Sequence, residues 1–261
     1  SDRLWLNSGV IVQKSNQAQR TGFIETENLD PVYANIERII GVPIGHLIVD
    51  VTRKGGGDYA RGILPPNIKE MISDGKLGLD TVFSGLLWYS ELMGYGKAEL
   101  VEMHYDIRRD ARLEDHFGDY FIDHIKNPYS IMPIAGVYTG GCEAVTGWPF
   151  GVEYSEISPG LYELKFSVSE HDEELEDRLE IKGYRHREGD VDLERCPTCG
   201  GPMGLSKFKW DEENGFIIDT WTDRRMTMVG PYVMDPLFEE LEKELGDGIP
   251  SAVVESQRLF T

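Results

Sequence analysis

The apolar periodicity of residues 77–93 is the strongest constraint that this sequence places on its fold. Large apolar side chains recur there every three or four residues, which is the spacing that lines one face of an α-helix. The residues on this face are Leu79, Val82, Phe83, Leu86, Leu87, Tyr89 and Leu92. A face this broad must be buried against other elements, so we expect a helix in the core that ends at Gly94.

Shorter patterns on both sides of this segment predict strands and further helices. Asp30-Pro31 is typical of a helix start, because Asp caps the first turn and Pro suits the first helical position. Strands are expected at residues 9–13, 21–25, 46–51, 98–105, 152–154 and 161–168, and helices at 31–40, at 113–125 and within 128–147. This mixture predicts an α+β fold in which a mixed or antiparallel sheet packs against helices.

The composition changes sharply after Val168. Residues 170–180 contain seven Asp or Glu among eleven residues, which is typical of a solvated connector. We therefore expect an α+β domain at residues 1–168, an acidic connector at 169–190 and a tail at 191–261. The tail is predicted to form a small metal-binding extension, with a β-hairpin (207–210 and 216–219) and a C-terminal helix (235–245).

The net charge narrows the range of partners. The chain is acidic, with 26 basic and 46 acidic side chains and a formal net charge of −20. Such a surface repels phosphate backbones and anionic lipids, so we expect neither nucleic acid nor a membrane as partner. No window reaches the ~18 uninterrupted apolar residues of a membrane span. The first residues lack the apolar region of a signal peptide, and three cysteines do not suit a disulfide framework, so a cytoplasmic location is expected.

Two of the three cysteines stand in the run Cys196-Pro-Thr-Cys199-Gly-Gly-Pro. Cysteines two residues apart on a tight turn can direct both sulfurs at one point, which is half of a tetrahedral zinc site. No second pair follows. The other ligands would come from distant residues of this chain, with His186 and Cys142 as candidates, or from a second subunit. A tight turn with two metal-free thiols is one alternative, and a redox-active pair is another, although the βαβ context typical of such pairs is missing.

Two side chains are candidates for acid–base catalysis. His104 lies on a predicted strand with Glu102 and Asp106 two residues away on either side, which places the three on one face. Glu143 is the second candidate. A histidine in such a position is also commonly a half-buried structural residue.

The run Arg53-Lys-Gly-Gly-Gly-Asp58 follows a predicted strand, as a phosphate-binding loop would. It lacks the Gly-Lys-Ser/Thr ending of a Walker loop and the glycine spacing of a dinucleotide site. We therefore expect a flexible loop there and no nucleotide cofactor.

Five aromatic residues are candidates for the wall of a small-molecule pocket: Phe83, Trp88, Tyr138, Trp148 and Phe150. The same residues would also fit an ordinary packed core.

Several segments resemble the 4-vinyl reductase domain, a small α+β module that also occurs in aromatic-sensing transcription regulators. These segments are Gly94-Tyr-Gly96 with the strand after it, Asn127-Pro-Tyr-Ser130, Gly136-Val-Tyr-Thr-Gly140, Gly147-Trp-Pro149 and Val152-Glu-Tyr-Ser-Glu156. The resemblance extends over roughly residues 9–168. It implies binding of a hydrophobic or aromatic small molecule in the domain interior, often within a homodimer. Sensor members hold zinc through a Glu followed by two Cys; Glu156 resembles that Glu, but Ser158-Pro-Gly160 follows it here.

Three functions are compatible with these observations. The first is a protein that binds an apolar small molecule and has a zinc site in its tail. The second is a metal-dependent enzyme, or a subunit of one, that acts on a hydrophobic or aromatic substrate. The third is an assembly subunit that docks through the amphipathic segment 236–245.

Overall fold

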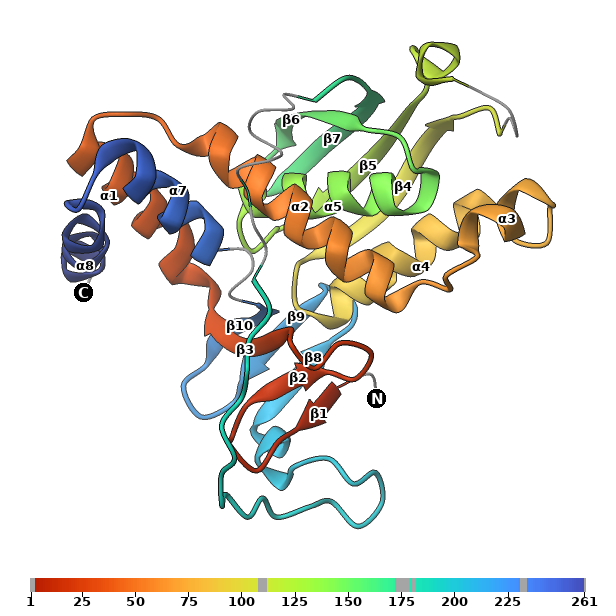
Figure 1. The fold of residues 1–261 in the computed structure, drawn as a ribbon. Helices are drawn as coiled ribbons and strands as arrows, with labels where there is room; N and C mark the ends of the chain where they lie inside the picture. Colours follow the sequence, from red (N-terminus) through yellow and green to blue (C-terminus); the bar gives the residue numbers. More distant parts are fainter. Residues whose placement is uncertain (1–2, 108–111, 172–178, 180–181, 231–233, 261) are drawn as a thin grey trace.

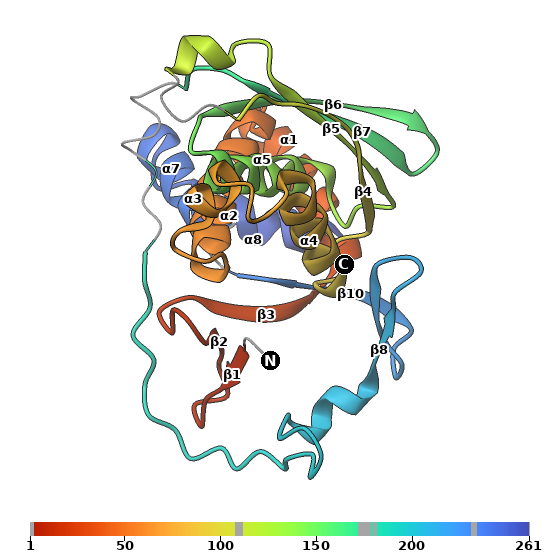
Figure 2. The same cartoon turned by 90° about the vertical axis from the view of Figure 1, so that its right-hand side faces the viewer.

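The computed structural model describes residues 3–107, 112–171, 179, 182–230 and 234–260. Within them the chain forms seven α-helices and two antiparallel sheets, so the predicted α+β fold class is confirmed. The helices form a layer between the two sheets (Figure 1, Figure 2). They are α1 (Leu29–Ile40), α2 (Gly45–Ile63), α3 (Ile68–Ser73), α4 (Leu79–Leu92), α5 (Ile131–Thr146), α7 (Asp235–Leu245) and α8 (Ile249–Phe260).

The four-stranded sheet covers one side of the helices. Its strand order is β4 (Lys97–His104), β5 (Tyr120–Lys126), β7 (Leu161–Val168) and β6 (Phe150–Ser158). Along β5, Phe121, Asp123 and Ile125 are buried and alternate with more exposed residues, as a strand with one covered face requires. The Phe121 ring packs against Phe83 of α4 at a centroid distance of 4.5 Å and against Phe150 at 5.5 Å. Each fully buried side chain of this size contributes roughly 1.5–3 kcal/mol to stability.

The six-stranded sheet joins the two ends of the chain. Its order is β1 (Arg3–Trp5), β2 (Ile11–Gln13), β3 (Arg20–Glu25), β10 (Arg224–Val229), β9 (Phe216–Asp219) and β8 (Phe208–Asp211). Figure 2 shows this sheet curling from β1 round to β8. The central pair is β3 with β10, in the register Gly22↔Val229. The sheet therefore crosses the division predicted from composition, because β3 precedes the acidic connector and β10 belongs to the tail.

Helices α2 and α5 cross at unusually short range because glycines lie at their contact. A Cβ atom added at Gly140 would lie 2.0 Å from the carbonyl oxygen of Arg53, and one added at Gly136 would lie 2.0 Å from Thr52 Oγ1. From the other helix, a Cβ at Gly56 would lie 2.7 Å from Val137 Cα. Real Cβ atoms do not approach other atoms this closely, so the backbones touch where side chains would normally separate them.

This packing overturns two predictions. Residues 46–51 were expected to form a buried strand, and Arg53-Lys-Gly-Gly-Gly-Asp58 a flexible loop, but both segments belong to α2. Three consecutive glycines disfavour a helix by about 1 kcal/mol each relative to alanine. The close contact with α5 offsets this cost, since tertiary packing supplies most of a helix's stability in a folded protein.

The prediction of a helix at residues 113–125 is also wrong. A short 3₁₀ turn covers Leu113–His116, and β5 then begins at Tyr120. Gly118 between them has φ +106°, a conformation that ends a helix and that L-residues rarely adopt. The aromatic residues that indicated a helix are also common in strands. The burial of every second residue is the pattern of a strand with one covered face.

The other expected elements are confirmed within a few residues at their ends. The strands are β2, β3, β4, β6, β7, β8 and β9, and the helices are α1, α4, α5 and α7. The apolar face of α7 is largely covered within the chain, because Leu237 is fully buried and Leu241 is 3 % exposed. Parts of the predicted acidic connector, residues 172–178, 180 and 181, lie outside the described residues. In the part of the chain that is described, no helix combines the length and the apolar character that crossing a membrane requires.

Replacing Gly140 with Ala should destabilise the protein strongly, because the new Cβ would overlap the Arg53 carbonyl oxygen and force α2 and α5 apart. We expect a loss of about 2–4 kcal/mol, seen as a melting temperature roughly 5–15 °C lower in a calorimetric scan. The matched control is Gly85→Ala on the exposed side of α4, where nothing lies within 4 Å of an added Cβ. The control should be neutral or slightly stabilising. Equal melting temperatures for the two variants would contradict the account of this contact.

Candidate functional site

An apolar cavity lies between α2, α4, α5 and the covered face of the four-stranded sheet. Its volume is about 60 Å³, several times what a single water molecule needs. It is lined by Gly56, Tyr59, Ala60, Ile63, Phe83, Leu86, Leu87, Tyr89, Ser90, Met93, Tyr95, Asp123, Val137, Tyr138, Gly141 and Cys142. This volume suits a narrow apolar group.

Small residues at the helix contact create this space. The glycines that bring α2 and α5 together continue into the cavity wall as Gly56 and Gly141. A Cβ added at Gly141 would have Leu86 Cδ1 as its nearest neighbour, at 3.9 Å, so a side chain here would extend into the cavity without a clash. The cavity is therefore a consequence of the same small residues that set the distance between the helices.

Most polar groups in the wall are satisfied within the protein. Ser90 donates a hydrogen bond to the Leu87 carbonyl at 2.6 Å, so the Tyr138 hydroxyl, 2.7 Å away, must donate to Ser90. The hydroxyls of Tyr59 and Tyr89 lie 2.5 Å apart. Arg3 of β1 donates to the Tyr59 hydroxyl. These bonds fix the tyrosine rings, so the wall is rigid before any ligand enters.

Asp123 is the exception in this wall. It lies in the middle of the apolar face of β5, between Phe121 and Ile125, and is 5 % exposed. Its cross-strand neighbours are Leu100 on β4 and Leu164 on β7. Within the described residues its carboxyl group has no hydrogen-bond or ion-pair partner, and desolvation by burial raises the pKa of that carboxyl to about 8. A carboxyl group without a partner in an apolar site is costly, and such groups concentrate at functional sites.

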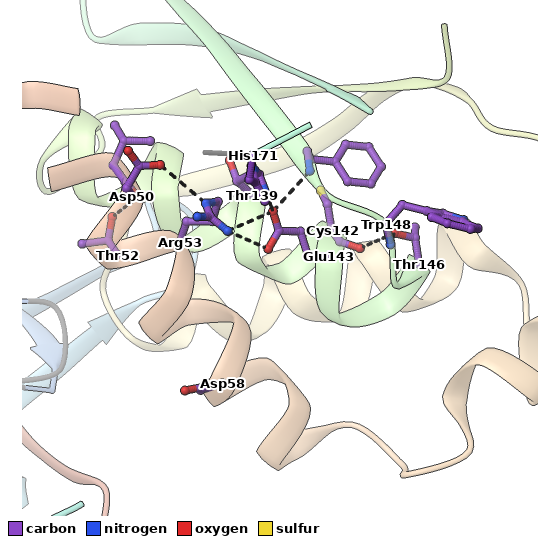
Figure 3. A network of polar contacts seen from close by, with 12 residues as sticks. Asp50, Thr52, Arg53, Asp58, Thr139, Cys142, Glu143, Thr146, Trp148 and His171 are labelled. Atoms are coloured by element: carbon purple, nitrogen blue, oxygen red, sulfur yellow. Dashed lines mark hydrogen bonds and ion pairs between the residues drawn. The ribbon is translucent and has the colours of Figure 1, made fainter. Parts of the chain in front are cut away.

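A second cluster of charged groups ties α2 to α5 (Figure 3). Arg53, which is 4 % exposed, lies with Nη1 3.2 Å from Glu143 Oε2 and with Nε 3.6 Å from Asp50 Oδ1. His171 Nε2 lies 2.6 Å from Glu143 Oε1, which also accepts a hydrogen bond from the Phe150 N–H at 3.2 Å. Burial is the main cause that raises the pKa of Asp50. Both oxygens of Glu143 are thus engaged in holding α2, α5 and the start of β6 together.

The two candidates for acid–base catalysis lie outside the cavity. Glu143 belongs to the cluster around Arg53. His104 is exposed on β4, and its ring stacks on its cross-strand neighbour Tyr120 with the centroids 5.6 Å apart. The Tyr120 hydroxyl donates to Glu102, so this carboxylate pairs with the tyrosine instead of with the imidazole. The structure does not bring His104 and Glu143 together.

The five aromatic candidates for the pocket wall have different surroundings. Phe83 and Tyr138 line the cavity. Phe150 is fully buried against Phe121. Trp148 packs against the buried His116 at a ring distance of 5.0 Å. Trp88 is 58 % exposed on the outer side of α4.

The candidate zinc ligands are also dispersed. Cys196 and Cys199 lie on an exposed turn that is closed by a hydrogen bond from Gly200 N–H to Cys196 O at 2.9 Å. Backbone N–H groups of Cys199 and Thr198 lower the pKa of the Cys196 thiol. His186 is bonded to the carbonyl oxygen of Gln17 at 2.7 Å. Cys142 is buried in the cavity wall, where burial raises its pKa.

Across the described ranges, no group of three or more His, Cys, Asp or Glu side chains could hold a metal ion. The two tail cysteines alone therefore do not complete a four-ligand zinc site. Comparison with protein-family models, with curated proteins and with solved structures finds no match for this chain.

Sequence reasoning missed the residue that distinguishes this site. Asp123 alternates with Phe121 and Ile125 in the sequence, which is the signal of an acidic residue on the apolar face of a strand. The expectation of a helix at 113–125 concealed that signal, because the three residues do not share one helical face.

Replacing Asp123 with Asn should change how stability depends on pH. The folded-state pKa of about 8 lies above the ordinary value of 3.8, so this group stabilises the fold fully below pH ~4, and the contribution is lost as the pH rises through 8. The groups that interact with it electrostatically are Tyr138 and Cys142 of α5, whose pKa values are both raised, so neither titrates in this range. The variant should match the wild type near pH 4 and exceed its free energy of unfolding by on the order of 2–4 kcal/mol at pH 8.

Urea unfolding of both proteins at several pH values measures this difference. The control is Asp58→Asn, an exposed residue whose surface ion pair with Arg61 contributes little. Parallel pH profiles for wild type and Asp123→Asn would show that the carboxyl is not buried in solution as described.

Proposed function

We propose that this protein binds a small, predominantly apolar molecule in the cavity between α2, α4, α5 and β5. The observation that carries the proposal is the cavity itself, an unfilled apolar space with rigid aromatic walls and few polar groups. Protein interiors are normally packed without such voids, and pre-formed apolar pockets with a small number of polar groups are the usual form of small-molecule sites. The resemblance to the 4-vinyl reductase domain supports the same function.

The other two functions have less support. A metal-dependent enzyme would need its metal beside the substrate, but the cavity wall contains no histidine among the described residues, and Cys196 and Cys199 do not line it. An assembly subunit would need the apolar face of α7 free for a partner, but Leu237 and Leu241 are buried within this chain.

Filling the cavity tests the proposal. Gly141→Leu places its Cβ in free space and its branched end in the cavity, so it should compete directly with a ligand. n-Octanol, used as an apolar probe in calorimetric titration, should bind the wild type saturably and the variant at least tenfold more weakly. The matched control is Gly85→Leu, which adds the same side chain on the exposed side of α4 and should leave binding unchanged. Equal binding by the two variants, or no binding by the wild type, would refute the proposal.

We further propose that Cys196 and Cys199 bind zinc together with the same pair from a second copy of the chain. The position of the pair supports this arrangement, because Cys199 is exposed and Cys196 partly exposed, so a second chain can reach both sulfurs. Four thiolates give the tetrahedral environment that structural zinc prefers. We also propose that the protein is cytoplasmic, because reducing conditions keep cysteines out of disulfides and available to bind zinc.

Elemental analysis of natively purified protein should find about half a zinc per chain, in a dimer. The Cys196→Ser/Cys199→Ser double variant should contain no zinc and run as a monomer. Cys142→Ser, which alters the buried cysteine on α5, should keep both properties. Absence of zinc from the wild type would contradict the metal site, and one zinc per monomeric chain would contradict the sharing.

A further inference from the structure

We infer that the molecule bound in the cavity carries a basic amine, and that Asp123 is the residue that binds it. This inference rests on the proposed function, because it concerns the polar end of the same ligand. The lining residues of the cavity provide the first observation. Asp123 is the one acidic side chain among them, and no Lys, Arg or His accompanies it in the described wall.

The apolar surroundings leave Asp123 without a counter-charge. Its neighbours on the same face are Phe121 and Ile125, and those on the adjacent strands are Leu100 and Leu164. A buried carboxylate needs a cation or several hydrogen-bond donors, and the residues that the structure describes supply neither here. An ammonium group on the ligand would supply both at once.

Other charged groups near the cavity are already paired. Glu91 of α4 binds Lys97 at 2.7 Å and accepts the Ala98 N–H at 3.1 Å. Arg3 of β1 donates to the Tyr59 hydroxyl and lies over the Tyr59 ring. It is not a cause of the pKa shift of Asp123, which desolvation alone produces. Asp123 is therefore the ionisable side chain of the described wall that would gain a partner from a cationic ligand.

The remaining wall suits a cation. Five aromatic rings line the cavity: Tyr59, Phe83, Tyr89, Tyr95 and Tyr138. Aromatic faces attract cations, and they do so most strongly where water is excluded. The Tyr138 hydroxyl donates its proton toward Ser90, so its oxygen keeps a lone pair for an N–H of the ligand.

The protonation states of Asp123 and of the amine predict a distinctive pH dependence of binding. Without ligand, Asp123 holds a proton at neutral pH, because its pKa is raised to about 8. An alkylammonium ion enters already charged, so forming the ion pair requires the carboxyl to release its proton to solvent. Binding below pH 8 thus releases about one proton per site, and the affinity rises up to tenfold for each pH unit.

A matched series of probes tests the inference: n-octylamine, n-octanol and octanoate, which share one chain and differ in the head group. Calorimetric titration at pH 5, 6 and 7 should show octylamine binding the wild type more tightly than octanol at pH 7, with an affinity that rises with pH. Octanol affinity should not change with pH, and octanoate should bind most weakly at pH 7, where it is ionised. Repeating the octylamine titration in buffers of different ionisation enthalpy measures the released proton directly.

Asp123→Asn keeps the size of the side chain and removes its charge. It should lose the preference for octylamine and the pH dependence, and still bind octanol; Asp58→Asn should behave as wild type. Octanol binding without any preference for octylamine would overturn the inference and leave the proposed function standing. Tighter binding of octanoate would also overturn it. Failure of all three probes to bind the wild type would overturn both.

Discussion

The close contact between α2 and α5 is the interaction on which the rest of this structure depends. Gly136 and Gly140 allow the backbone of α5 to touch that of α2 near Thr52 and Arg53. Arg53, held near the crossing, reaches Glu143 one turn further along α5, so the charged cluster and the glycine contact fix the same pair of helices. The same two helices line the cavity together with α4 and β5, and their glycines Gly56 and Gly141 stand in its wall. The small residues of the helix contact therefore also leave the space unfilled.

Asp123 is difficult to explain as a structural residue. An apolar residue of similar size at this position of β5 would avoid the desolvation cost of a carboxyl and continue the pattern of Phe121 and Ile125. A sequence that otherwise agrees with its fold breaks local rules mainly where function requires it. The carboxyl and the unfilled space lie in the same place, so the proposed ligand, with its polar group at Asp123, would account for both.

The sequence predicted the elements whose local pattern agrees with their final environment. The helix α4, with its broad apolar face, and the hairpin of β6 and β7 are of this kind. The errors occurred where a distant partner decides the structure. The glycines of α2 read as a loop until α5 is placed against them, and residues 120–126 read as helical until β4 and β7 pair on either side. The same contrast holds for the residues of the site. Phe83 and Tyr138 were predictable from aromatic content, whereas Asp123 could be found only by knowing which face of β5 is covered.

The most direct test of this account is the ionisation of Asp123 itself. Carbon-13 NMR of the side-chain carboxyl groups follows each aspartate through a pH titration, and Asp123→Asn assigns the relevant signal. The account predicts that this signal titrates with a midpoint near the pKa of about 8 that burial produces, and that saturating octylamine moves the midpoint well below neutrality. A midpoint in the ordinary range near pH 4, unaffected by the amine, would mean that the carboxyl is solvated or paired and would contradict the account.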